Sequence, residues 1–86
     1  MEGVKPAVKA FILEQYLPGE KPENLTDTTP LISGGILDSL ATLSLIAFLE
    51  ERFRISFAPH EATVDYIDTL DGIEAIVRAK QGATGG

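Results

Sequence analysis

Apolar residues recur at helical spacing in three segments of this chain, and nowhere do they alternate with the two-residue period of a half-buried strand. The first segment covers residues 4–17, the second covers residues 39–53, and the third runs over about residues 65–80. The pattern predicts an all-α fold, a small helical bundle of three main helices. The stretch 59–67 has room for one further short helix of a turn or two.

The segment between the first two helices, residues 18–37, has the composition of a long ordered loop. It holds three prolines, three glycines and the cluster Thr26-Asp27-Thr28-Thr29, all of which favour turns. Its apolar residues are Leu25, Leu31, Ile32, Ile36 and Leu37. Loops of this length are uncommon inside a compact domain and are often functional. We therefore expect this loop to pack over the core.

The chain has 86 residues, enough for one hydrophobic core and too few for two. We expect a single domain over residues 1–81 and a flexible tail over residues 82–86. The absence of cysteine excludes a disulfide scaffold, a thiolate metal site and a thiol nucleophile. No apolar run reaches the roughly 18 to 20 residues that span a bilayer. We therefore expect a cytoplasmic monomer with no membrane span.

The formal net charge of −6 is concentrated in one half of the chain. Residues 38–74 contain eight acidic and two basic residues, which account for the whole net charge, and the remainder is balanced at five of each. The negative electrostatic potential of so many acidic residues repels phosphate backbones and attracts basic protein surfaces. The charge therefore argues against nucleic acid as a partner, although it would also serve solubility alone.

Two good helix-capping residues, Asp38 and Ser39, stand where the long loop gives way to the second helix. If Asp38 is the N-cap, its carboxylate accepts hydrogen bonds from first-turn N–H groups, and Ser39 becomes the first helical residue with its hydroxyl facing solvent. The helix dipole favours a phosphate there by about 0.3 to 1 kcal/mol. Ser39 is thus a candidate site for a phosphodiester-linked group, although many helices simply begin with such a pair.

The second helix carries more apolar side chains than one core-facing stripe can use, with eight among residues 40–49. At about 100° per residue, the stripe that faces the core comprises Thr42, Leu45, Ile46, Leu49 and Phe53. The opposite side, which we name the outward face, comprises Leu40, Leu43, Ser44, Ala47, Glu50 and Glu51. An exposed apolar surface with an acidic rim predicts a docking site for an apolar and basic partner. Scattered surface apolar residues are the simpler alternative.

The sequence Ile36-Leu37-Asp38-Ser39-Leu40, followed by an apolar helix that ends in Leu49-Glu50-Glu51-Arg52-Phe53, resembles the acyl carrier protein family. The resemblance covers about residues 8–80. It includes Phe11-Ile12-Leu13-Glu14, Thr28-Thr29-Pro30-Leu31-Ile32 and Tyr66-Ile67-Asp68-Thr69-Leu70-Asp71-Gly72-Ile73. Asp-Ser-Leu alone is a weak signal, whereas the whole series in this order is a strong one.

The resemblance implies that Ser39, flanked by Asp38 and Leu40, carries 4′-phosphopantetheine derived from coenzyme A. The thiol at the end of this arm would hold an acyl or aminoacyl group as a thioester, so the protein needs no cysteine. It would present Ser39, be recognised, and shelter its cargo. The implied partners are a phosphopantetheinyl transferase, an acyl- or aminoacyl-loading ligase and a downstream transferase. The chain would be their substrate and not an enzyme.

Three departures from the family pattern favour a specialised carrier over one for general fatty-acid synthesis. Two residues separate Gly35 from Asp38 where family members often have one. Ala41 and Ser44 stand where fatty-acid carriers usually have further acids, and Ala47 replaces a common bulky apolar residue. The resemblance then points to a dedicated pathway or an aminoacyl cargo.

Two other functions compete with the carrier. A serine hydrolase would need a base for Ser39, and His60 is the only histidine, with no Gly-x-Ser-x-Gly motif to support it. A helical adaptor that binds a basic partner without a prosthetic group is the alternative, and the fate of Ser39 distinguishes it from a carrier. We predict no metal site, because Asp65, Asp68 and Asp71 lack the spacing of a calcium loop and are better explained as helix-end acids.

Overall fold

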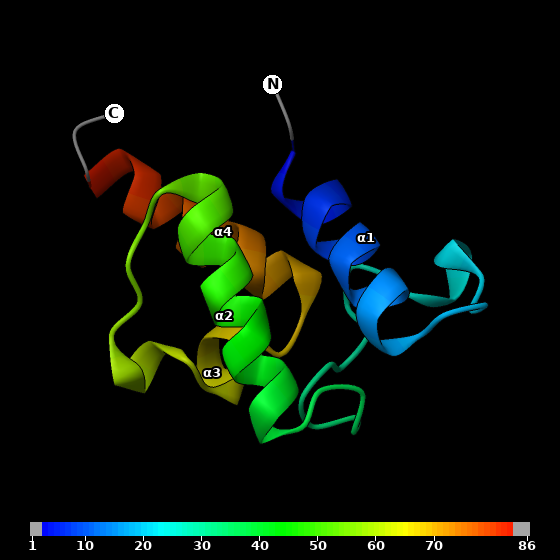
Figure 1. The fold of residues 1–86 in the computed structure, drawn as a ribbon. Coiled ribbons are helices and arrows are strands. Elements are labelled where there is room, and N and C mark those ends of the chain that lie inside the picture. Colours follow the sequence, from blue (N-terminus) through cyan, green and yellow to red (C-terminus); the bar gives the residue numbers. More distant parts are fainter. Residues whose placement is uncertain (1–2, 84–86) are drawn as a thin grey trace.

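The computed structural model describes residues 3–83, and every regular element in this range is a helix. The elements in chain order are α1 (Val4–Tyr16), the 3-10 turn η1 (Pro22–Asn24), α2 (Ser39–Phe53), the 3-10 turn η2 (Pro59–Glu61), α3 (Val64–Ile67) and α4 (Leu70–Ala83). The start of α1 and the end of α4 lie toward the top of Figure 1, and the long loop rounds the opposite end, where α2 begins. The all-α prediction is confirmed.

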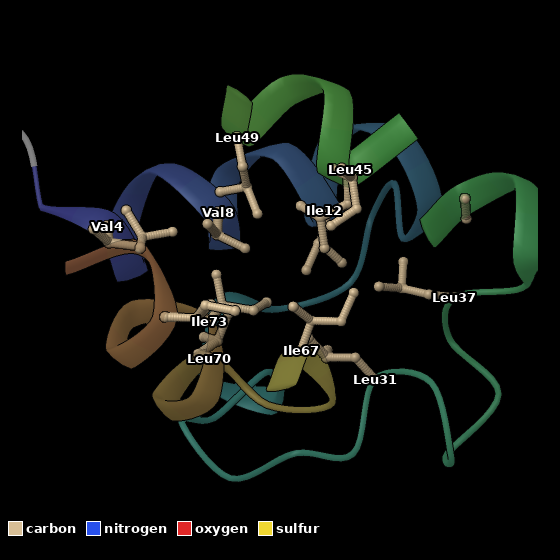
Figure 2. Close-up of a cluster of buried hydrophobic side chains, with 14 of the residues drawn as sticks. Val4, Val8, Ile12, Leu31, Leu37, Leu45, Leu49, Ile67, Leu70 and Ile73 are labelled. Atoms are coloured by element: carbon tan, nitrogen blue, oxygen red, sulfur yellow. The ribbon is translucent and has the colours of Figure 1, made fainter. Parts of the chain in front are cut away.

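The helices pack around one core. α1 contacts both α2 and α4, and the short α3 packs against α4. Side chains from all four helices and from the long loop point toward one another in Figure 2. Those with the least exposure are Val8, Ile12, Leu25, Leu31, Leu37, Leu45, Leu49, Ile67, Leu70, Ile73 and Val77. Burial of these apolar residues is the main stabilising contribution.

The long loop packs over the core, as predicted. Leu25, Leu31 and Leu37 are fully buried, whereas Ile32 and Ile36 are half-buried. The turn before α2 requires glycine, because a side chain at Gly34 would collide with the carbonyl oxygen of Pro30. The loop is therefore an ordered part of the domain.

The further short helix predicted within 59–67 is present as α3, but the third main helix, predicted to begin at about residue 65, begins only at Leu70. The chain forms α3, turns at Asp68 and Thr69, and begins again as α4. The turn forms because the Thr69 hydroxyl accepts a hydrogen bond from the Gly72 N–H at 3.0 Å and caps the new helix. A Cβ at Gly72 would lie 2.7 Å from the carbonyl oxygen of Tyr66, so glycine permits the close packing of α3 on α4.

The C-terminal boundary also differs from expectation. The predicted tail begins at residue 82, but α4 continues to Ala83. The rest of that tail lies outside the described residues. Within residues 3–83, no helix combines the length and the apolar character needed to cross a membrane.

Candidate functional site

Asp38 caps α2 as predicted, and this leaves Ser39 as the first helical residue. The Asp38 backbone is extended, and its carboxylate accepts the Ala41 N–H at 2.8 Å. The Asp38 carbonyl oxygen accepts both the N–H and the hydroxyl of Thr42, each at 2.8 Å. Ser39 is exposed, and its hydroxyl makes no hydrogen bond with any described residue. The side chain is therefore available for chemistry at an anion-tolerant helix start.

A surface groove of about 680 Å³ opens beside Ser39. Its lining comes from the long loop, from the first turns of α2 and from the start of α3: Ile32, Leu37, Asp38, Ser39, Thr42, Leu43, Ala62, Thr63 and Val64. Most of these side chains are apolar or present methyl groups. A chain linked to the Ser39 hydroxyl could therefore lie along an apolar surface.

The apolar part of the outward face of α2 faces solvent, as predicted. Leu40 is 76% exposed and Leu43 is 60% exposed, and Ser44 and Ala47 are exposed as well. Val64 on α3, 48% exposed, lines the same groove as Leu43 and adds to this apolar surface. Sequence reasoning missed Val64, because the spacing of α2 alone carries no information about which residues of α3 border it.

Glu50 is a correction to the predicted outward face. It is half-buried, and its carboxylate accepts the N–H of Phe57 at 2.8 Å. The bond fixes the chain after it leaves α2 through Arg54, a residue in the left-handed region with φ 57°. Glu50 therefore has a structural role in fixing the segment that follows α2. Glu51 is exposed, so it is the carboxylate of this pair that is available to a partner.

The core stripe of α2 is also close to prediction. Thr42, Leu45, Ile46 and Leu49 are buried, but Phe53 is only half-buried at the end of the helix. Ala41 is buried in addition.

A second hollow, of about 480 Å³, lies between α1 and α2 and borders the outward face. Ser44, Ala47, Phe48 and Glu51 line it from α2, and Phe11 lines it from α1. The rings of Phe11 and Phe48 stack with centroids 4.4 Å apart. The outward face is thus bordered by a hollow on each side.

Asp68 was predicted to be a simple helix-end acid, and its structural role is larger. Its carboxylate accepts the N–H groups of Ile32 and Ser33 at 2.7 and 2.9 Å, and the Ser33 hydroxyl at 2.7 Å. These bonds from Ser33 and Ile32 hold the pKa of Asp68 below its ordinary value of 3.8, against a smaller opposing effect of desolvation. A carboxylate that receives several donors stays ionised at neutral pH.

Most of the acidic half is engaged within the protein. Six of its eight acids make a hydrogen bond or ion pair with described residues: Asp38, Glu50, Glu61, Asp68, Asp71 and Glu74. Glu61 bonds Lys80 at 2.6 Å and the N–H of Ala58 at 2.7 Å, and these bonds lower its pKa. Glu51 and Asp65 are exposed. Charge alone therefore overstates the acidic surface that is free for a partner.

The residues considered for a serine hydrolase or a metal site do not form such a site in the described part of the chain. His60 is exposed and makes an edge contact with Tyr66, with ring centroids 6.5 Å apart, and it has no hydrogen bond to Ser39. Across the described part of the chain, no three acidic or histidine side chains form a group that could hold a metal ion.

No protein-family model matches this chain, and no curated protein matches it either.

Proposed function

We propose that this protein is an acyl carrier protein that carries an acyl or aminoacyl group as a thioester on 4′-phosphopantetheine attached to Ser39. The observation that carries the proposal is the exposed Ser39 hydroxyl, which makes no hydrogen bond with a described residue and begins α2 between an apolar groove and an apolar outward face. The resemblance of the surrounding sequence to acyl carrier proteins supports the same function.

The local chemistry suits attachment of the arm. In the reaction, the Ser39 hydroxyl oxygen forms a bond to phosphorus and loses its proton, while the phosphoanhydride of coenzyme A breaks and adenosine 3′,5′-bisphosphate leaves. The resulting phosphodiester lies at the positive end of α2, where the helix dipole favours its charge. The Asp38 carboxylate accepts the Ala41 N–H and so fixes the first turn that presents Ser39.

The partners that we propose are a phosphopantetheinyl transferase, a loading ligase for an acyl or aminoacyl group, and a transferase that receives the cargo. Leu40, Leu43 and Ala47 supply the apolar contact, and Glu51 supplies charge at its rim. We propose a cytoplasmic monomer that serves a specialised pathway. The protein is the substrate of these enzymes and performs no catalysis itself.

The test is modification with coenzyme A, Mg²⁺ and a broad-specificity phosphopantetheinyl transferase, followed by intact mass. The parent should gain one phosphopantetheine, and Ser39→Ala should gain none. Ser56→Ala, which removes another exposed serine hydroxyl, is the matched control and should be modified like the parent.

Two results would reject the carrier function. One is a parent that no broad-specificity transferase modifies, and the other is a Ser39→Ala variant that is modified equally well. An unmodified parent that still binds a basic protein through the outward face would favour the helical adaptor instead.

A further inference from the structure

A single residue, Asp68, holds the part of the long loop that lies beside Ser39. Within the described chain, the hydrogen bonds that join residues 31–36 to another element all end on Asp68. Its carbonyl oxygen accepts the Leu31 N–H at 2.6 Å, and its carboxylate accepts the N–H groups of Ile32 and Ser33 and the Ser33 hydroxyl. Three consecutive N–H groups of the loop therefore point to one residue.

The segment that Asp68 holds is closed on itself. The Leu37 N–H donates to the Leu31 carbonyl oxygen at 2.8 Å, and the Gly35 N–H donates to that of Ile32 at 3.1 Å. Gly34 passes so close to Pro30 that a side chain there has no space. The segment is expected to move as one piece, and Asp68 is its polar attachment, in addition to the packing of Leu31 and Leu37 in the core.

This attachment bears directly on the groove beside Ser39. Ile32 and Leu37 line the groove from the loop, and Val64 lines it from the first residue of α3. Asp68 directly follows the last residue of the same short helix. One end of α3 thus borders the groove, and Asp68 at the other end holds the loop whose residues Ile32 and Leu37 also line it.

We propose that Asp68 is a positioning residue that determines cargo specificity: by holding Ile32 in place, it sets how long an acyl chain the groove can shelter. The inference rests on the proposed carrier function, since the chain would enter the groove from the Ser39 arm. Without the Asp68 carboxylate, Ile32 and Ser33 lose their acceptor, and the loop wall is free to move away from Val64. An acyl chain then loses apolar contacts in proportion to its length.

The test measures how fast hydroxylamine cleaves acetyl, butyryl, hexanoyl and octanoyl thioesters carried on Ser39, each relative to the same acyl-coenzyme A in solution. In the parent, we expect octanoyl to be cleaved at least about fivefold more slowly than acetyl, because each buried methylene adds apolar contact. Asp68→Ala should abolish this dependence on chain length. Asp68→Asn should restore most of it, because the amide oxygen still accepts the N–H groups of Ile32 and Ser33.

Two further variants complete the comparison. Ser33→Ala removes one of the hydrogen bonds and should give an intermediate dependence on chain length. Asp65→Asn changes an exposed acid on the same helix that has no hydrogen bond or ion pair with any residue the structure describes, and it should behave like the parent. A parent-like dependence in Asp68→Ala would overturn the proposal. Equal acceleration at every chain length, acetyl included, would also overturn it, because that result reports general loss of structure.

A parent that carries the arm but shows no dependence on chain length would overturn this inference and leave the carrier function standing. A second measurement does not require Ser39 to be modified. Free octanoyl-pantetheine, titrated into the unmodified protein, should shift the methyl signals of Ile32 and Val64 in the parent and in Asp65→Asn, but not in Asp68→Ala. If no transferase modifies Ser39, the proposed function fails, and this titration alone decides the role of Asp68.

Discussion

Single carboxylates that accept backbone N–H groups hold the irregular parts of this protein in place. Asp38 begins α2, Glu50 fixes the chain beyond its end, and Asp68 holds the long loop. A buried or half-buried N–H without an acceptor would be costly, so each carboxylate replaces a backbone partner that no regular element supplies. Acids that the sequence presents as surface charge therefore have structural roles.

The first prediction concerns the cap of α2. Asp38→Ala should lower the free energy of unfolding by about 0.5 to 2 kcal/mol, because the Ala41 N–H loses its acceptor. The same variant should slow the modification of Ser39, since the first turn of α2 positions its hydroxyl. Urea melts and transferase assays measure the two effects, and unchanged stability would contradict the assignment of Asp38 as the N-cap.

The second prediction is the pH dependence that Asp68 confers. Its pKa is lower in the folded protein than its ordinary value of 3.8, so its bonds to Ile32 and Ser33 contribute fully above that value. The contribution disappears as the pH falls through the lower folded pKa. The difference in unfolding free energy between the parent and Asp68→Asn should therefore be constant near neutral pH and shrink in acid. A difference that does not change with pH would show that the charge of Asp68 is unimportant.

At the scale of elements, the sequence predicts α1 and α2 well because both have long, regular apolar periods and clear ends. It places the start of the third main helix too early, because Ile67, Leu70 and Ile73 continue a helical period across the break at Asp68 and Thr69. The local signal was present, since Thr69 is a good capping residue three positions before Gly72. The apolar period masked it.

The candidate site also has parts that the sequence predicts and parts that it does not. Ser39, Asp38 and the exposure of Leu43 follow from local capping and helical spacing, which the sequence contains. The groove and the role of Asp68 join residues more than thirty positions apart, as in the pairing of Ser33 with Asp68. Such contacts depend on how the loop packs against α3, which no local pattern specifies.

The third prediction tests the outward face of α2. Leu43→Ser should slow the transferase at every salt concentration, because it removes a central apolar contact with that enzyme. The same variant should lower the free energy of unfolding by no more than about 1 kcal/mol. Glu51→Lys should slow it most at low ionic strength, because a rim charge acts mainly on encounter. Glu50 is unsuitable for this charge reversal, since its replacement also removes the acceptor of the Phe57 N–H.

The matched control for Leu43→Ser is Leu45→Ser, two residues along the same helix and fully buried. Leu45→Ser should lower the free energy of unfolding by about 2 to 5 kcal/mol or more, which is the usual cost of truncating a leucine in a core. A Leu43→Ser variant that loses comparable stability would show that the inner and outer sides of α2 have been exchanged.

At the scale of the whole molecule, one cation links three distant segments. The ammonium of Lys5 on α1 lies 2.6 Å from the Asp71 carboxylate and 3.2 Å from that of Asp27 in the long loop. Glu74, one turn further along α4, is 3.8 Å away. The Asp71 N–H also donates to the Asp27 carbonyl oxygen at 3.1 Å. Without Lys5, three carboxylates would repel one another where α1, the loop and α4 meet.

The last prediction follows from this arrangement. Hydrogen bonds to Asp71 and Asp27 raise the pKa of Lys5 from 10.5 to about 12, so its stabilising contribution is complete below 10.5 and is lost as the pH rises through the folded value. Lys5→Met keeps most of the apolar stem and removes the charge, and it should lower the midpoint of urea unfolding at neutral pH. The loss relative to the parent should shrink with added salt and again in strong alkali, because screening and deprotonation both weaken the same contacts. Lys9→Met, on the same helix and without an ion pair to any of residues 3–83, should show little loss under any of these conditions. Equal effects of the two variants would mean that the Lys5 contacts do not hold α1 to the loop and α4.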